Sequence, residues 1–236
     1  MKIPSKLLTL CGVLTLSLIA NAGTITTYSG QDDGASATGP WPLSAAAQAS
    51  LLAAAGPTNT LTFESLTPGY SSTIAAAPGV SITLTGLNYG PGFSGVTNIT
   101  DGNLYGFNTT SGGSNWLGFA GGSATFNFAS PVTAFGFYLT GVQLVFTSTI
   151  PVTFNDGTAE ALLAPVNVNG GAAYFGFTDV GGSTSSITIA DISNDAWGID
   201  DVSYSAPVVT PEPGTFMLIG SGLLTLAGAI RRKIHV

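Results

Sequence analysis

The sequence predicts an all-β protein: an antiparallel β-sandwich of the jelly-roll kind with one short alanine-rich helix. Most of the chain consists of short segments rich in Val, Thr, Ile and Phe, separated by turns that contain glycine and asparagine. Residues 23–210 are nearly twice as long as the ~100 residues of an immunoglobulin-like sandwich, which favours the larger jelly roll. No repeat of fixed period is visible, which argues against a β-helix.

The first predicted elements are a strand at Thr24–Tyr28 and a helix at Ser44–Ala55. The first residue of the helix is a good N-cap, alanines fill its length, and Gly56-Pro57 ends it. We expect its contacts with the sheet to be Leu51 and Leu52. The alternative for this alanine-rich segment is irregular coil.

Strand signals continue from there to the end of the body. Val80–Leu84 alternates apolar and polar residues, so its three apolar side chains share one face. Pro131 turns the chain into a strand at Val132–Leu139, in which Gly136 leaves room for a neighbour. The segment Asp191–Asp195 is predicted to be a surface turn. The other predicted strands are Leu61–Glu64, Ala124–Phe128, Val142–Ser148, Val152–Phe154, Ala172–Phe177, Ser186–Ala190 and Trp197–Tyr204.

Charged residues are distributed unevenly along the chain. All five Lys and Arg residues, the single Cys and the single His lie outside residues 23–210. Of the 12 acidic residues only Glu212 lies outside this body, which therefore carries a charge of about −11. Nucleic acid is excluded as a partner, because neutralising phosphates requires cations. Disulfides, a Ser-His-Asp triad, a cysteine nucleophile and a histidine-ligated zinc site are excluded for the body as well.

The N-terminus has the three parts of a secretory signal peptide. Lys2 and Lys6 form a positive region, Leu7–Ile19 is apolar, and Ala20 and Ala22 form a small-x-small cleavage site. We expect residues 1–22 to engage the Sec translocon and signal peptidase to cleave after Ala22. The alternative, an uncleaved anchor, is disfavoured because the apolar region is short.

The C-terminus also has three parts. Pro211, Glu212, Pro213 and Gly214 keep the backbone extended. Thr215–Ile230 is uncharged and predicts a transmembrane helix, and Arg231, Arg232 and Lys233 form a basic membrane stop. As a helix the apolar run spans about 24 Å, less than the ~30 Å of a bilayer core, which suits a temporary hold during processing. The predicted divisions are a signal peptide (1–22), a β-sandwich body (23–207), a linker with the Pro-Glu-Pro motif (208–214), a transmembrane helix (215–230) and a basic cytoplasmic tail (231–236).

These tail residues resemble the PEP-CTERM sorting signal of exopolysaccharide-producing Gram-negative bacteria. The resemblance implies that an exosortase, a membrane-embedded cysteine protease-transpeptidase, recognises the Pro-Glu-Pro motif. It also implies an intermediate anchored in the inner membrane, followed by delivery to the outer surface or the extracellular matrix. The alternative is an ordinary single-span anchor with a chance Pro-Glu-Pro.

The three-residue spacing of Ile199 and Val202 breaks the two-residue period of a strand. If both side chains face the core, a β-bulge must lie at Asp200-Asp201 and turn one carboxylate inward. In a body without cations, such a carboxylate requires hydrogen bonds or a hard metal such as calcium.

This segment and Phe63-Glu64 resemble extracellular jelly-roll modules of the MAM and carbohydrate-binding-module type. In those modules an early Phe-Glu and a terminal Ile-Asp-Asp-Val meet in adjacent strands, often around a structural calcium. The resemblance implies Glu64, Asp200 and Asp201 as calcium ligands. The alternative is that Glu64 and Asp200 accept backbone N–H bonds and that Asp201 is solvated.

Three tryptophans, Trp41, Trp116 and Trp197, are candidates for stacking on sugar rings. Trp116 is the best of them for binding exopolysaccharide, because glycines precede and follow it in a loop-rich setting; the alternative is a core position. We expect a non-enzymatic surface or matrix protein, structural or adhesive in exopolysaccharide or biofilm. A glycan-binding module is the first alternative, and a glycoside hydrolase with a carboxylate pair is the second.

Overall fold

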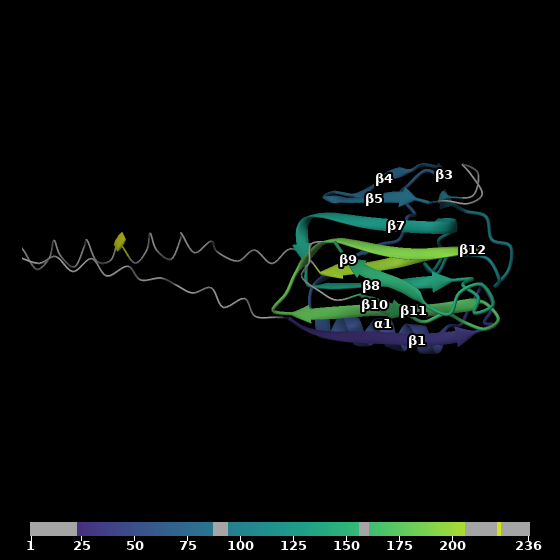
Figure 1. Ribbon diagram of the computed structural model, residues 1–236, viewed down its shortest axis with the longest axis horizontal. Helices are drawn as coiled ribbons and strands as arrows, with labels where there is room; N and C mark the ends of the chain where they lie inside the picture. The colour runs from purple at the N-terminus through teal and green to yellow at the C-terminus, as the bar shows by residue number, and fades with distance from the viewer. Residues whose placement is uncertain (1–22, 87–93, 156–160, 206–220, 223–236) are drawn as a thin grey trace, which may run out of the picture.

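The computed structural model describes residues 23–86, 94–155, 161–205 and 221–222. Within them, twelve strands form one hydrogen-bonded sheet with the central order β1-β11-β8-β12-β7-β5-β4 (Figure 1). All pairs of named strands are antiparallel. The elements are β1 (Thr24–Asp33), α1 (Pro42–Ala55), β2 (Thr58–Leu61), β3 (Gly69–Tyr70), β4 (Thr73–Ala77), β5 (Val80–Thr85), β6 (Gly95–Thr97), β7 (Trp116–Val132), β8 (Ala134–Thr140), β9 (Ile150–Phe154), β10 (Leu162–Ala164), β11 (Gly171–Val180) and β12 (Thr184–Ser205).

Strand β12 doubles back on itself. Its first residue, Thr184, pairs with Val132 of β7, and its last residue, Ser205, accepts a hydrogen bond from the N–H of the adjacent Thr133 at 2.8 Å. A straight strand of this length would separate its ends by roughly 70 Å. Both ends of β12 therefore lie at the same end of the molecule.

The bend in β12 lies between Asp191 and Ala196, where its register against β7 shifts. Strand β7 turns the same corner at Gly121 and Gly122, whose φ angles of 66° and 78° favour glycine. The predicted surface turn at 191–195 is therefore wrong. These residues belong to a strand that continues around the corner, joining the two strands predicted on either side.

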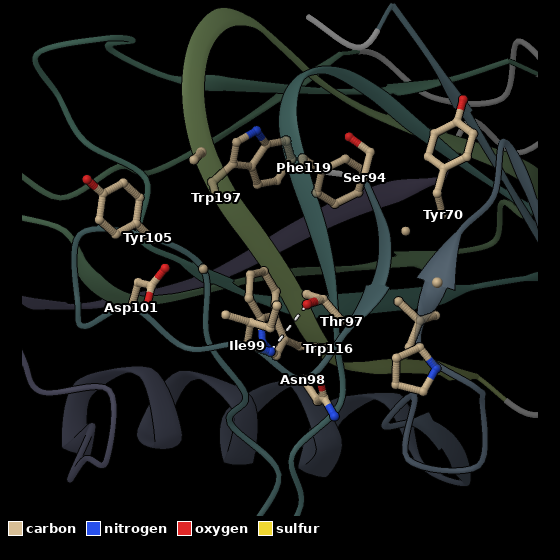
Figure 2. Close-up of a pocket in the computed structure, with 16 residues that line it drawn as sticks. Tyr70, Ser94, Thr97, Asn98, Ile99, Asp101, Tyr105, Trp116, Phe119 and Trp197 are labelled. Atoms are coloured by element: carbon tan, nitrogen blue, oxygen red, sulfur yellow. Dashed lines mark hydrogen bonds between the residues drawn. The ribbon is translucent and has the colours of Figure 1, made fainter. Parts of the chain in front are cut away.

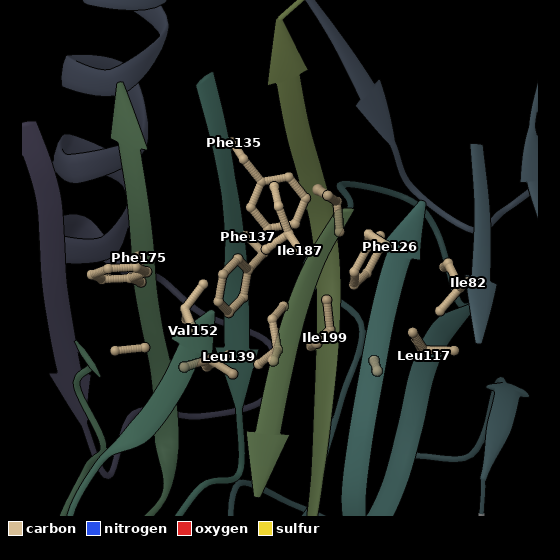
Figure 3. Close-up of a cluster of buried hydrophobic side chains, with 14 of the residues drawn as sticks. Ile82, Leu117, Phe126, Phe135, Phe137, Leu139, Val152, Phe175, Ile187 and Ile199 are labelled. Carbon is tan, nitrogen blue, oxygen red and sulfur yellow. The ribbon is translucent and has the colours of Figure 1, made fainter. Parts of the chain in front are cut away.

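The shared strands divide the sheet into two facing layers. The second half of β7 and the first half of β12 join β4, β5, β9 and β10, and the remaining halves join β1, β2, β3, β6, β8 and β11. The core lies between the layers, where the ring of Phe126 meets that of Phe135 at 5.4 Å (Figure 3). The all-β antiparallel prediction is confirmed, whereas the specific likeness to jelly-roll modules stays a prediction.

Helix α1 covers the outer face of β1, β11 and β8. It begins at Pro42, and its first N–H groups are capped by Asp32, whose carboxylate accepts bonds from Leu43 N (3.1 Å) and Ser44 N (2.8 Å). The prediction of Ser44 as N-cap is wrong, because the helix starts two residues earlier. Leu51 is buried, as predicted, whereas Leu52 is half-buried.

Gly136 leaves room for the helix, as predicted. A Cβ at this position would lie 2.5 Å from a methyl group of Leu51. The same methyl would be 2.8 Å from a Cβ at Gly176, the residue paired with Gly136 on β11. Paired glycines on adjacent strands therefore allow the helix to approach the sheet closely.

Two of the predicted strands differ in the structure: Leu61–Glu64 is a strand only at its first residue, and Val142–Ser148 is not a strand. Strand β2 stops at Leu61, because Phe63 takes a left-handed conformation with a φ of 61°. The segment Val142–Ser148 is irregular, and its apolar residues Leu144 and Phe146 are exposed. The alternation in Val80–Leu84 is confirmed, since all three of its apolar side chains are buried.

The predicted signal peptide, with Ala20 and Ala22, lies outside the described residues, as do the Pro-Glu-Pro motif and the basic stop. Of the predicted transmembrane segment, the structure describes Ser221 and Gly222. In the part of the chain that is described, no helix has both the length and the apolar character needed to cross a membrane.

Candidate functional site

A β-bulge in β12 places the two aspartates of the predicted metal site. Asp200 and Ser203 pair with residues two apart on β8, so Asp201 and Val202 stand opposite a single residue. Asp201 has a left-handed backbone with a φ of 45°. Ile199 and Val202 are both buried, so the bulge inferred from their spacing is confirmed.

The carboxylates of Asp200 and Asp201 bind one short segment, Thr109-Thr110. The Oδ2 of Asp200 accepts the N–H groups of Thr109 (2.6 Å) and Thr110 (3.2 Å). Asp201 accepts the hydroxyl of Thr109 on Oδ2 (3.0 Å) and that of Thr110 on Oδ1 (2.7 Å). The bulge therefore fixes the loop that crosses in front of it.

Asp200 is fully buried, and its Oδ1 has no hydrogen-bond partner among the described residues. Burial, and then the charge of Asp201, raise the pKa of Asp200 from 3.8 to about 7. The backbone N–H groups oppose this rise, because they stabilise the ionised form.

Glu64 holds the far end of the same loop. Its Oε1 accepts Asn108 Nδ2 (2.7 Å), Ser114 N (2.9 Å) and Asn115 N (2.9 Å). Gly113 permits this approach, because a Cβ there would overlap the carboxylate. Glu64 and Asp200 thus both accept backbone N–H bonds, and residues 108–115 are held by carboxylates at each end.

Calcium prefers six to eight oxygen ligands. Asp200 and Asp201, with the hydroxyls of Thr109 and Thr110, offer such oxygens close together, and Asp200 Oδ1 is available. In the described part of the chain, however, no three acidic, histidine or cysteine side chains form a group that could hold a metal ion. Calcium binding by Asp200 and Asp201 stays a prediction. The third predicted ligand, Glu64, accepts hydrogen bonds from the loop instead.

A cavity of about 540 Å³ lies at the corner end of the sandwich. It is lined by residues of β3, of β6 and the loop after it, of β7 before its bend and of β12 after its bend (Figure 2). Tyr70 and Tyr105 line it from opposite sides and are 49% and 50% exposed. Its volume falls within the ~300–1,000 Å³ range of small-molecule sites.

Trp116 lines this cavity but is not an exposed platform. The residue is only 6% exposed, because its indole lies against Gly118, Gly198 and Gly106. Trp197 is also buried, and its ring stacks on that of Phe119 at 4.5 Å. The prediction that Trp116 is an exposed platform is therefore wrong, because the side chain is buried. The accessible rings at this site are those of Tyr70 and Tyr105.

Sequence reasoning missed these two tyrosines and the two threonines that hold the aspartates. Nothing local distinguishes Tyr70 or Tyr105 from other aromatic residues near glycines. Their role depends on β3 and the loop after β6 meeting at the corner of β7 and β12, which is a property of the tertiary structure.

Residues 209–233 match the family described as the PEP-CTERM protein-sorting motif. The chain carries a PEP-CTERM sorting motif. The matched range contains the predicted Pro211–Gly214 motif, the apolar run and the basic stop. A PEP-CTERM motif implies an exported protein that is anchored in a membrane, processed by an exosortase and then placed at the cell surface.

No curated protein matches this PEP-CTERM chain. Among solved structures, the chain is similar to the K2 cleaved adhesin domain of Lys-gingipain, with 16% sequence identity and a TM-score of 0.38. The match covers 63% of this chain and 99% of the adhesin domain. At this level the similarity supports no argument about function.

Proposed function

We propose that this PEP-CTERM protein is a non-enzymatic component of the cell surface or exopolysaccharide matrix of a Gram-negative bacterium, with a structural or adhesive role. The observation that carries the proposal is the sorting motif at residues 209–233, which belongs to exported proteins. In the described part of the chain, the body attached to it is one hydrogen-bonded sheet around a large hydrophobic core.

The chemistry of the described carboxylates supports a non-enzymatic role. Glycoside hydrolysis requires two carboxyl groups about 5–9.5 Å apart across a sugar. Glu64 and the Oδ2 of Asp200 instead accept N–H groups of the protein. Among the described residues that line the cavity, only Asp101 carries a carboxylate. A body without Lys, His or Cys has no Ser-His-Asp triad, thiol nucleophile or Schiff-base lysine.

A charge of about −11 on the body also bears on its partners. It disfavours direct contact with acidic polysaccharides, so adhesion to such polymers requires bridging cations. Calcium bound at the half-buried Asp201 is one such route. Contact with uncharged polysaccharide through the cavity is the second candidate function, favoured by the exposed rings of Tyr70 and Tyr105.

The test follows the tagged full chain in an exopolysaccharide-producing Gram-negative host with and without its exosortase. We expect wild type to reach the surface or matrix in the first host and to stay in the membrane fraction in the second. Replacing Pro211, Glu212 and Pro213 together by alanine is expected to cause the same retention. Pro207→Ala, just outside the matched motif, is the control and is expected to be sorted normally.

A second measurement addresses the role itself. We expect cells that lack the chain to retain less exopolysaccharide, and wild type but not the triple-alanine variant to restore it. We also expect the purified chain to release no reducing ends from this polysaccharide. Turnover of the polysaccharide, or unchanged polysaccharide retention without the chain, would contradict the proposed function.

A further inference from the structure

We propose that the cavity at the corner of β7 and β12 binds a saccharide that has no acidic groups, held between Tyr70 and Tyr105. The inference rests on the proposed matrix role and identifies the part of the body that contacts the polymer. Its evidence is the construction of the sheet at this corner, the exposure of the two tyrosine rings, and the lack of Lys, Arg and His in residues 23–210.

Three adjacent strands near the cavity carry glycine at the same position of the register. Gly95 of β6, Gly118 of β7 and Gly198 of β12 stand in register across three strands, and Tyr70 of β3 pairs with the first of them. Directly paired residues share one face of a sheet, so these glycines form a strip without Cβ atoms beside the tyrosine ring. Glycine within strands often marks a close approach by another group.

The indole of Trp116 occupies part of this strip. A Cβ at Gly198 would lie 2.5 Å from its ring, and one at Gly118 would lie 3.1 Å away. Gly106, next to Tyr105, also lies against this ring. Trp116 is therefore a fixed wall, whereas Tyr70 and Tyr105 keep half of their surface open to a ligand.

Exposed tyrosines on opposite sides of a cavity suit a sugar ring. The C–H face of a pyranose is apolar and carries partial positive charge, so it packs on the negative face of an aromatic ring. The phenol hydroxyl at the edge of each ring can bond to sugar hydroxyls at the same time.

Three residues that line the cavity carry buried polar atoms without a hydrogen-bond partner in the described part of the chain: Ser94 Oγ, Trp116 Nε1 and Trp197 Nε1. All three residues are more than nine-tenths buried. Buried donors are nearly always paired in folded proteins. These three atoms have almost no surface open to water, so they belong to the packed wall of the cavity, and contact with a ligand falls to the exposed tyrosines.

Charge restricts the saccharide further. Residues 23–210 contain no cation, and Asp101 contributes a carboxylate to the cavity lining. A uronate or sulfate placed here would face negative charge without a counter-ion. Neutral sugars avoid this cost, so the acidic members of a polysaccharide mixture are excluded.

The test uses the full-length chain purified in mild detergent, with chelator present to remove calcium bridging. Tetrasaccharides of glucose, galactose, mannose and N-acetylglucosamine are titrated by calorimetry and tryptophan fluorescence, and a tetragalacturonate serves as the acidic probe. We expect at least one neutral tetrasaccharide to bind and to change the fluorescence, and the acidic probe not to bind.

Tyr70→Ala and Tyr105→Ala are each expected to weaken that binding by about threefold to tenfold, the usual contribution of one aromatic contact. Phe146→Ala is the matched control, because Phe146 is 51% exposed and lies outside the cavity lining. The proposal is overturned if no neutral probe binds, if the acidic probe binds as well, or if the tyrosine variants lose no more affinity than the control. Normal sorting and polysaccharide retention without probe binding would overturn this inference alone, whereas binding by a chain that is never exported would overturn the matrix role alone.

Discussion

Replacing the buried Asp200 by asparagine tests how the protein holds a carboxylate without a cation. The unfolded chain releases this proton near pH 3.8 and the folded protein near pH 7. Between these values the folded state binds more protons than the unfolded state, so the free energy of unfolding falls as pH rises through this window. A difference of about three pKa units corresponds to about 4 kcal/mol.

Asparagine does not titrate, and its side-chain oxygen can still accept the N–H groups of Thr109 and Thr110. We therefore expect Asp200→Asn to gain stability relative to wild type, by up to about 4 kcal/mol, as pH rises from 4 to 8 in the presence of chelator. For a domain of this size the gain is about 8–16 °C in melting temperature.

The assay is thermal unfolding of the full chain in mild detergent, measured by circular dichroism at closely spaced pH values. Asp101→Asn is the control, because it removes an exposed carboxylate and should leave the profile parallel to that of wild type. A stability difference between Asp200→Asn and wild type that stays constant from pH 4 to 8 would refute the reasoning. It would mean that the threonine amides keep Asp200 ionised throughout this range.

Three further predictions concern the loop, the helix and the metal. Glu64→Gln weakens three bonds to residues 108–115, and we expect a loss of about 2 kcal/mol in urea unfolding and faster proteolysis in this loop. Leu51→Ala should cost about 2–5 kcal/mol because it opens a gap between α1 and β8, whereas the exposed Leu43→Ala should cost less than about 0.5 kcal/mol; equal losses would contradict the packing described. Calcium at about 100 times its dissociation constant should add about 2.7 kcal/mol at pH 7.5, and Asp201→Asn should abolish the gain; an unchanged wild-type melting temperature would remove calcium from this site.

Much of the fold could be predicted because its signals are local. The alternation of Val80–Leu84 and the three-residue spacing of Ile199 and Val202 each report which side chains face the core, and both predictions are confirmed. Gly136 was predictable for the same reason, since a glycine between buried aromatic residues in a strand indicates close packing.

The remaining features depend on contacts distant in sequence. Val142–Ser148 has the apolar residues of a strand, but past the buried Val142 it finds no layer to pack against, so Leu144 and Phe146 stay exposed. Asp32 replaces Ser44 as the helix cap because β1 brings its carboxylate to the helix start. Trp116 is buried because glycines of β7, β12 and a loop converge on its ring, which no local pattern indicates.

The return of β12 separates the cavity from the end of the described body. The strand passes the cavity at Trp197 and ends at Ser205, beside Thr133, before the chain continues to the sorting motif. Eight residues of strand cover about 25 Å, roughly three times the ~8 Å over which charges are screened at physiological salt. Charges near Ser205, where the described body ends, are therefore screened at the cavity, and a polymer bound there leaves the end of β12 uncovered.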